Sequence, residues 1–344
     1  MRQLLISFLI LVANITIYAQ GCCSGGAGGP IAGGAASGVL QEHQMEISIN
    51  HQFNTSNTFY NGSEVTETEK YFNNLKSNYL FFRTDYGVSE KLTLSIASGY
   101  FFSKTKEAED ITSNRTSSGF SDLIIFPRYN IYNKNNNFKR TEIALGLGIK
   151  MPLGTHIDST LTVAASSYAP GFPDKDQYER NSPLIQTTNG SNDFMFYSFI
   201  FREYQKRKLR LFISALYVKK NFNSSGIKFG DYSSLGLFIS KTLFRQWGVT
   251  TQLKLEHIGK IEAAENIDLL ANYNIEPIST ASNKAFFTPQ ISYSQKGLTF
   301  FVTSEIPIYQ YLHGTQIGSQ NQFTFGVNYR FLTKKPETEF ELKK

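Results

Sequence analysis

Histidine and acidic side chains that could cooperate in hydrolysis gather between residues 156 and 179. Asp158 follows His156 by two residues, and Asp174, Asp176 and Glu179 come later in the same stretch. A hydrolytic site needs such groups to be brought together by the fold, and their spacing alone does not achieve this. We therefore interpret the stretch as part of a long loop rather than as an active site.

A second catalytic pattern is absent from the sequence. Lipid-hydrolysing β-barrels carry their catalytic histidine two residues before their catalytic serine. No histidine of this chain stands two residues before a serine; the five are His43, His51, His156, His257 and His313. We expect no enzymatic activity and no cofactor.

The two cysteines, Cys22 and Cys23, are adjacent and are the only cysteines in the chain. A metal site would need further ligands at suitable spacing, and the nearest histidine, His43, stands alone in sequence. Cys22 could carry a lipid, although the three residues before it lack the large apolar residue usual in a lipidation signal. We expect no metal site, and lipidation of Cys22 stays an open alternative.

Eleven charged residues occupy one set of alternate positions in stretches whose other positions are largely apolar. Alternate residues of a strand point to opposite faces, so a barrel with its apolar face outward directs these charges into its lumen. The predicted lumen-lining residues are Arg83, Asp85, Asp122, Arg128, Glu142, Lys150, Arg210, Lys254, Glu256, Glu305 and Arg330, six positive and five negative. Such a mixture predicts ion pairs that keep a narrow lumen rigid, whereas a selective pore would carry one sign in excess at a constriction.

The stretch Gln320–Phe331 shows the underlying pattern most clearly. Its odd-numbered residues from Phe323 onward are apolar or aromatic, and its even-numbered residues from Thr324 to Arg330 are small or polar. An apolar face with aromatic ends suits lipid, and a polar face suits an aqueous lumen. Eleven earlier stretches repeat the pattern, at residues 44–53, 79–88, 91–100, 122–132, 141–152, 194–202, 209–219, 234–243, 249–257, 286–294 and 298–309. The sequence therefore predicts an all-β fold, a transmembrane antiparallel up-and-down β-barrel of twelve strands, with fourteen as the alternative.

The strand at 141–152 makes the two faces testable. Its outward residues include Leu147, where an arginine would meet lipid, and its inward residues include Gly148, where we expect serine to be tolerated.

The connections between the predicted strands alternate in length. Those at residues 54–78, 101–121, 153–193 and 258–285 are long, and each connection that follows an even-numbered strand holds only a few residues. Asn133–Asn137 is expected to form part of one such turn. Bacterial outer-membrane barrels combine an even strand number with short periplasmic turns and longer outer loops. We therefore expect the long loops to face the outside of the cell.

The chain is expected to divide into a signal peptide at 1–19, a glycine-rich leader at 20–43, the barrel at 44–332 and a polar tail at 333–344. A short basic beginning precedes an apolar run too short to span a bilayer, and a small residue, Ala19, marks the cut. Gly21–Gly38 holds eight glycines in eighteen residues, so few of its side chains can be buried. This leader is either free in the periplasm or a plug that enters the barrel.

Composition agrees with this interpretation. The mean hydropathy of -0.26 is that of a soluble protein, because a barrel strand averages a lipid face with a lumen face. The net charge of +6 is spread without a dense basic stripe, so we expect no nucleic-acid partner.

Four segments carry a family resemblance: Asp85–Leu94, Gly119–Tyr129, Ala144–Gly154 and Asn189–Phe194. In order and spacing they resemble the outer-membrane proteins of the phenol meta-pathway family, transporter-type barrels distantly similar to long-chain fatty-acid and aromatic-hydrocarbon channels. The composition looks like that of a Bacteroidetes protein. The hydrocarbon channels have fourteen strands and an N-terminal hatch, and the twelve strands predicted here depart from that pattern.

Together these observations predict a channel or transporter in the bacterial outer membrane for a small molecule, with a hydrophobic or aromatic solute implied by the resemblance. The expected partners are outer-membrane lipid, the solute, and the barrel-assembly machinery, which would recognise Gln320–Phe331. The alternative is a structural or adhesive surface barrel that transports nothing.

Overall fold

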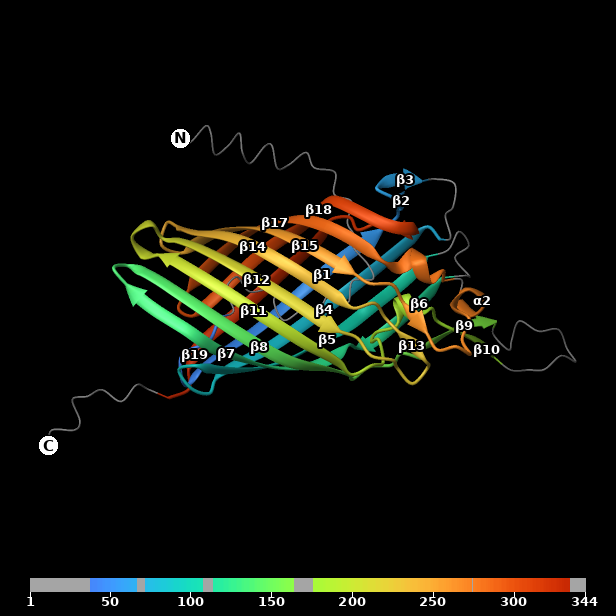
Figure 1. Cartoon of the computed structure of the whole chain (residues 1–344), viewed down its shortest axis with the longest axis horizontal. Coiled ribbons are helices and arrows are strands. Elements are labelled where there is room, and N and C mark those ends of the chain that lie inside the picture. The colour runs from blue at the N-terminus through green and yellow to red at the C-terminus, as the bar shows by residue number, and fades with distance from the viewer. Residues whose placement is uncertain (1–37, 67–71, 108–113, 164–175, 274, 335–344) are drawn as a thin grey trace, which may run out of the picture.

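The computed structural model describes residues 38–66, 72–107, 114–163, 176–273 and 275–334, and twelve long strands form one closed barrel (Figure 1). In chain order these strands are β1 (Gln44–Ser56), β4 (Asn74–Gly87), β5 (Leu92–Glu107), β7 (Asp122–Asn136), β8 (Lys139–Pro152), β11 (Asp193–Tyr204), β12 (Leu209–Lys219), β14 (Tyr232–Leu243), β15 (Trp247–Ile258), β17 (Ser282–Gln295), β18 (Leu298–Ile317) and β19 (Gln322–Leu332). Each pairs antiparallel with the barrel strands before and after it. The predicted all-β, twelve-stranded, up-and-down barrel is confirmed.

The barrel closes where its first and last strands meet. The ladder between β1 and β19 runs from Gln44 opposite Leu332 to Phe53 opposite Phe323. A closed sheet pairs the backbone groups of every wall strand, which a strand-built wall in lipid requires. The closing strand begins at Gln322, two residues later than expected.

The outer face of the wall is apolar. On β8, Leu145, Leu147 and Ile149 are 46%, 63% and 44% exposed, while the intervening Gly146 and Gly148 are buried. This alternation places large apolar side chains where lipid would lie and small residues toward the lumen.

The inward glycines of β8 are covered by an aromatic ring. A Cβ atom added to Gly148 would lie 2.6 Å from Phe126 Cδ2 and 3.1 Å from the carbonyl oxygen of Ile125. A Cβ added to Gly146 would lie 2.7 Å from Phe126 Cζ. The expectation that serine is tolerated at Gly148 is therefore wrong, because the ring already occupies the space.

One end of the barrel consists of tight turns. β7 and β8 are joined by Asn137 and Phe138, both with positive φ (48° and 63°), and β17 and β18 are joined by Lys296 and Gly297, also with positive φ (49° and 84°). Two-residue turns of this kind match the twist of the strands that they join. The turn expected at Asn133–Asn137 is shorter than predicted, because residues 133–136 continue β7 and pair with β8.

Longer connections gather at the opposite end, on the right in Figure 1. They contain β2 (Phe59–Gly62), β3 (Glu64–Thr66), β6 (Arg115–Phe120), β9 (Ser159–Val163), β10 (Gln177–Arg180), η3 (Pro183–Ile185), β13 (Ile227–Lys228), β16 (Glu262–Ala263), α2 (Leu269–Tyr273) and η5 (Pro277–Thr280). A small apolar cluster of Ile227, Ile261, Leu269 and Ile275 packs among them. These loops therefore have a folded core of their own. In the described parts of the chain, no helix combines the length and apolar character needed to cross a bilayer.

The main apolar core lies inside the barrel. β11 alternates in burial but carries apolar residues on both faces, since Phe196 and Ile200 face outward at 48% and 44% exposure while Tyr197 and Phe199 face inward at 5% and 2%. The buried cluster comprises Tyr79, Phe81, Ala97, Phe101, Ile124, Phe126, Ala144, Met195, Tyr197, Phe199, Phe201, Phe212, Leu216, Val218, Tyr232 and Phe238. Side chains from β4 round to β14 therefore fill part of the lumen.

Candidate functional site

The lumen has two walls of different chemistry. On β1 the inward residues Ser48, Asn50, Gln52 and Asn54 are polar and at most 5% exposed. The opposite side is formed by β12, which lies six strands further round the ring of twelve, and by its neighbours β11 and β14. These three strands present aromatic side chains to the lumen. The lumen therefore has a polar stripe along β1 and aromatic side chains along β11, β12 and β14 opposite it.

The aromatic wall is a continuous set of ring contacts. Phe199 stacks with Phe201 at 6.3 Å between ring centroids and contacts Phe212 at 5.9 Å, and Phe212 stacks on Phe238 at 4.4 Å. Each such ring pair stabilises the fold by about 0.5 to 1.5 kcal/mol beyond the contribution of the apolar surface that it buries. The wall is thus packed side to side along three neighbouring strands.

A cluster of charges lies toward the short-turn end of the lumen. Asp85 accepts hydrogen bonds from Arg83 Nε and from an Arg128 terminal nitrogen, each at 2.8 Å, and also from the Ser95 hydroxyl. Arg83 is 2% exposed and also faces Glu46 at 3.7 Å. A buried charge needs a partner of opposite sign, and here two guanidinium groups share one carboxylate.

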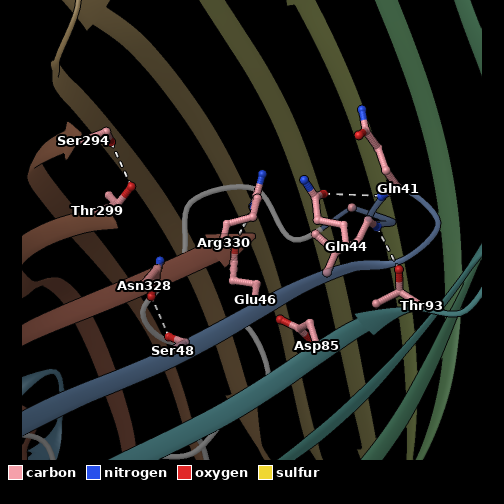
Figure 2. A network of polar contacts seen from close by, with 12 residues as sticks. Gln41, Gln44, Glu46, Ser48, Asp85, Thr93, Ser294, Thr299, Asn328 and Arg330 are labelled. Atoms are coloured by element: carbon pink, nitrogen blue, oxygen red, sulfur yellow. Dashed lines mark hydrogen bonds and ion pairs between the residues drawn. The ribbon is translucent and has the colours of Figure 1, made fainter. Parts of the chain in front are cut away.

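Arg330 of β19 completes this cluster at the mouth. Its Nε donates to Glu46 Oε2 at 2.6 Å across the β1–β19 seam, and Figure 2 shows the pair beside Asp85 and the Ser48–Asn328 hydrogen bond. The seam is therefore joined by side chains as well as by backbone.

A second cluster combines two lysines and two aspartates nearer the long loops. Lys150 lies 2.5 Å from Asp122 and 3.8 Å from Asp193, and Lys220 lies 3.0 Å from Asp193. Burial and the neighbouring Lys150 lower the pKa of Lys220 to about 8, against the attraction of Asp193.

A third cluster is built on β15 and β18. Lys254 lies 2.8 Å from Glu305 and 3.3 Å from Glu256, and Tyr232 donates to Glu256 at 3.1 Å. These pairs join side chains of one strand or of strands close together, so the charges are compensated along the wall.

The eleven residues predicted to line the lumen are distributed among these clusters, with two exceptions. Glu142 pairs with Arg140 at 2.7 Å at the short-turn mouth. Arg210 has no carboxylate within 4.0 Å among the described residues and donates to Thr242 at 2.9 Å.

The chain before β1 lies in the short-turn mouth. The backbone N–H of Val39 donates to Glu142 at 2.9 Å, that of Leu40 donates to Thr93 at 2.7 Å, and Arg128 donates to the carbonyl of Gly38 at 2.9 Å. Figure 2 shows the bond to Thr93 and the neighbouring Gln41. Leader residues 20–37, with both cysteines, lie outside the described residues, as do the signal peptide and the tail from residue 335.

Two cavities lie at the two ends of the lumen and share no lining residue. The inner cavity, about 240 Å³, is bordered by Gly38–Gln41, Glu46 and Arg128, and the outer cavity, about 210 Å³, lies among the long loops. Between them, Asn50 and Phe81 are 1% and 0% exposed. Side chains therefore separate the cavities.

The histidine and acidic residues of the 156–179 stretch are not brought together where the structure describes them. His156 Nε2 lies 2.9 Å from Ser224 Oγ, and partial burial and Arg180 lower the pKa of His156. Glu179 instead pairs with Arg115 at 2.6 Å. Asp174 is outside the described residues, within which no three His, Cys, Asp or Glu side chains form a metal-binding group.

Sequence reasoning missed three charged residues of the clusters, Glu46, Asp193 and Lys220, and one buried lysine outside them, Lys284. Glu46 lies on the polar face of a strand that was predicted, so alternation was sufficient to find it. Asp193 and Lys284 lie just before predicted strand starts, in residues that the structure adds to β11 and β17, and Lys220 lies directly after the end of β12. The aromatic wall was missed because aromatic residues were assigned to lipid; the run Phe194–Phe201, apolar on both faces, was its signal.

No protein-family model matches the chain, and no curated protein matches it in sequence. Among solved structures, an outer membrane channel from Pseudomonas putida F1 is similar, with a TM-score of 0.59 and 11% identity over 86% of this chain and 97% of that one. The KdgM porin (TM-score 0.37, 10% identity, 83% and 99% covered) and the NanC porin (0.40, 10%, 83% and 98%) overlap less well. At this identity the first similarity shows the fold that the two chains share.

Proposed function

We propose that this chain is an outer-membrane channel for a small molecule that has a polar and an apolar side. The observation that carries the proposal is the two-sided lumen, polar along β1 and aromatic from β11 to β14, with a cavity at each end. A solute moving along such a lumen keeps its polar groups hydrogen-bonded while its apolar surface slides on rings. An apolar or aromatic portion of the solute agrees with the family resemblance.

The proposal includes location and export. The apolar outer face supports insertion in a bilayer, and the N-terminal sequence supports a signal peptide that delivers the chain to the bacterial outer membrane. The closing strand β19 is the segment that the assembly machinery would recognise. Asp85 and Arg128, paired with each other, line the inner cavity, where a passing solute would have to displace or skirt them.

A second function is favoured by a specific observation. Packed side chains separate the two cavities, and the long loops have their own apolar core, as a surface protein that only displays its loops would require. The two functions differ in whether solutes cross the barrel.

Liposome swelling distinguishes them. Purified mature protein in liposomes should give swelling rates that fall with solute size and differ between sugars and aromatic alcohols of similar size. Rates equal to those of protein-free liposomes for every solute would exclude the channel and leave the structural barrel.

The leader offers a second measurement on the same protein. Because Gly38, Val39 and Leu40 are bonded to Arg128, Glu142 and Thr93 in the mouth, we propose that they narrow it. Deleting residues 24–40, with the signal and cut site kept, should raise single-channel conductance in planar bilayers. An unchanged conductance in a folded variant would show that these residues do not limit passage.

A further inference from the structure

The outer cavity combines an apolar wall with positive charge. Its wall includes Phe59, Phe72, Phe229, Tyr232, Ile261 and Ile275. Three lysines also line it, Lys106, Lys220 and Lys284, together with one carboxylate, that of the exposed Glu276. The cavity therefore has more positive than negative groups around an apolar space.

Lys284 is a buried cation with no carboxylate in contact. It is 6% exposed, and among the described residues no carboxylate lies within 4.0 Å of its ammonium group. The buried Lys150 and the half-buried Lys254, in contrast, each have a carboxylate at 2.8 Å or less. The Lys284 ammonium donates to Ser319 Oγ at 2.9 Å, and two of its three N–H donors remain for another acceptor.

The nearest candidate partner inside the barrel is otherwise engaged. Glu256 stands opposite Lys284 in the β15–β17 ladder, but its Oε2 bonds Lys254 at 3.3 Å and Tyr232 at 3.1 Å. Its other oxygen, Oε1, has no hydrogen-bond partner, so Lys284 does not reach it. Glu256 therefore attracts the Lys284 ammonium group through space without contacting it. A buried ammonium with no carboxylate in contact is costly, and an anion that binds it would lower that cost.

Of the other two lysines, Lys106 adds positive potential, whereas the charge of Lys220 is compensated by Asp193. Lys106 Nζ lies 4.9 Å from the ring centroid of Phe72, and Lys220 is 3.0 Å from Asp193. A small enclosed space with low-dielectric walls concentrates such potential. The apolar wall, in turn, selects against small, fully hydrated anions, since these have no apolar surface to bury.

We infer that the outer cavity binds a small organic carboxylate, with its carboxylate on Lys284 and its apolar body against the aromatic and aliphatic wall. This inference rests on the proposed channel function, for which the cavity would be the site of entry from the long-loop end. The amphipathic anion would then meet the two-sided lumen below it.

Titration calorimetry on the full mature protein in detergent tests the inference with benzoate, and with benzyl alcohol as the neutral counterpart. Benzoate should bind saturably, and Lys284→Met should weaken it at least tenfold while leaving the weak binding of benzyl alcohol unchanged. Lys260→Met is the matched control, because Lys260 is an exposed loop lysine outside the cavity and its loss should not change benzoate affinity. Ser319→Ala, which frees a donor of Lys284, should keep benzoate affinity or raise it.

The outcomes separate the inference from the channel function. Absence of saturable benzoate binding to the wild-type protein, or equal affinity in Lys284→Met, overturns the inference and leaves solute-dependent swelling untouched. Absence of swelling together with lysine-dependent benzoate binding overturns the channel and keeps the site. If Lys284→Met does not fold, Lys284→Gln and Ser319→Ala provide the comparison, and heat-modifiable migration on a gel establishes folding.

Discussion

Replacing Gly148 by serine should destabilise the barrel, because the new Cβ would collide with the Phe126 ring. The added atom would stand 2.6 Å from Phe126 Cδ2, whereas carbon atoms pack at about 3.5 to 4.0 Å, so the ring must move by about 1 Å. Phe126 is 2% exposed and packs edge-on against Tyr197 at 5.5 Å, which leaves it little room. Overpacking of this kind costs about 1 to 3 kcal/mol.

A double-mutant cycle isolates that collision. Folded protein, scored as the heat-modifiable band after urea titration in lipid vesicles, should fall for Gly148→Ser. Phe126→Leu should also destabilise, because it removes ring contacts, but adding Gly148→Ser to it should cost much less than in the wild-type protein. Equal costs in the two backgrounds, or full tolerance of serine with Phe126 present, would refute the packing argument.

Three further predictions concern the outer surface and the loops. Leu147→Arg, on the outward face, should lower the free energy of unfolding in lipid vesicles by about 2 to 4 kcal/mol, whereas Leu147→Ala should lower it much less. Equal urea midpoints for the two variants would argue against lipid contact at this position. In a variant without Cys22 and Cys23, a cysteine introduced at the exposed Asn266 should react with a membrane-impermeant maleimide on intact cells. A cysteine introduced at the exposed Asn135 should react only after the outer membrane is opened. The reverse labelling would mean that the barrel has the opposite orientation. Asp231 accepts hydrogen bonds from Lys219, from the backbone of Lys220 and from a tyrosine. Despite partial burial, these bonds hold the pKa of Asp231 below its usual range. The stability that they confer is therefore present at neutral pH and lost as pH falls through that lowered pKa. Asp231→Asn should thus be less stable than wild type at about pH 7, and the difference should vanish as pH falls through the lowered pKa of Asp231; a difference in stability that persists in acid would contradict this.

The wall of the barrel was predictable because lipid and lumen impose a period of two on every strand. The faces of β8 and β19 follow directly from their residues, and the number of strands follows from counting such stretches. Strand ends were less predictable, since above the lipid a strand no longer needs an apolar face. Lys284 illustrates this, because it lies before the point where alternation becomes visible.

The content of the lumen was harder to predict for a different reason. Alternation tells which way a side chain points, but contacts between strands far apart in sequence decide what fills the interior. Arg128 reaches Asp85 from a strand that is not its neighbour, and Phe126 covers glycines of the next strand. Phe199 faces inward although its chemistry suits lipid equally well, so residue type alone misassigned it.

The seam between β1 and β19 has a consequence for the order in which the barrel can assemble. Every other wall contact joins strands that follow one another along the chain, but this one brings Gln44 to Leu332. Because the entropy of loop closure grows with the logarithm of loop length, the seam costs only about 4 kcal/mol more to close than a short hairpin does. Until it closes, however, the sheet has two free edges whose backbone groups cannot remain unpaired in lipid. The Arg330–Glu46 pair, which joins those two edges, can therefore form only in the last step of barrel closure.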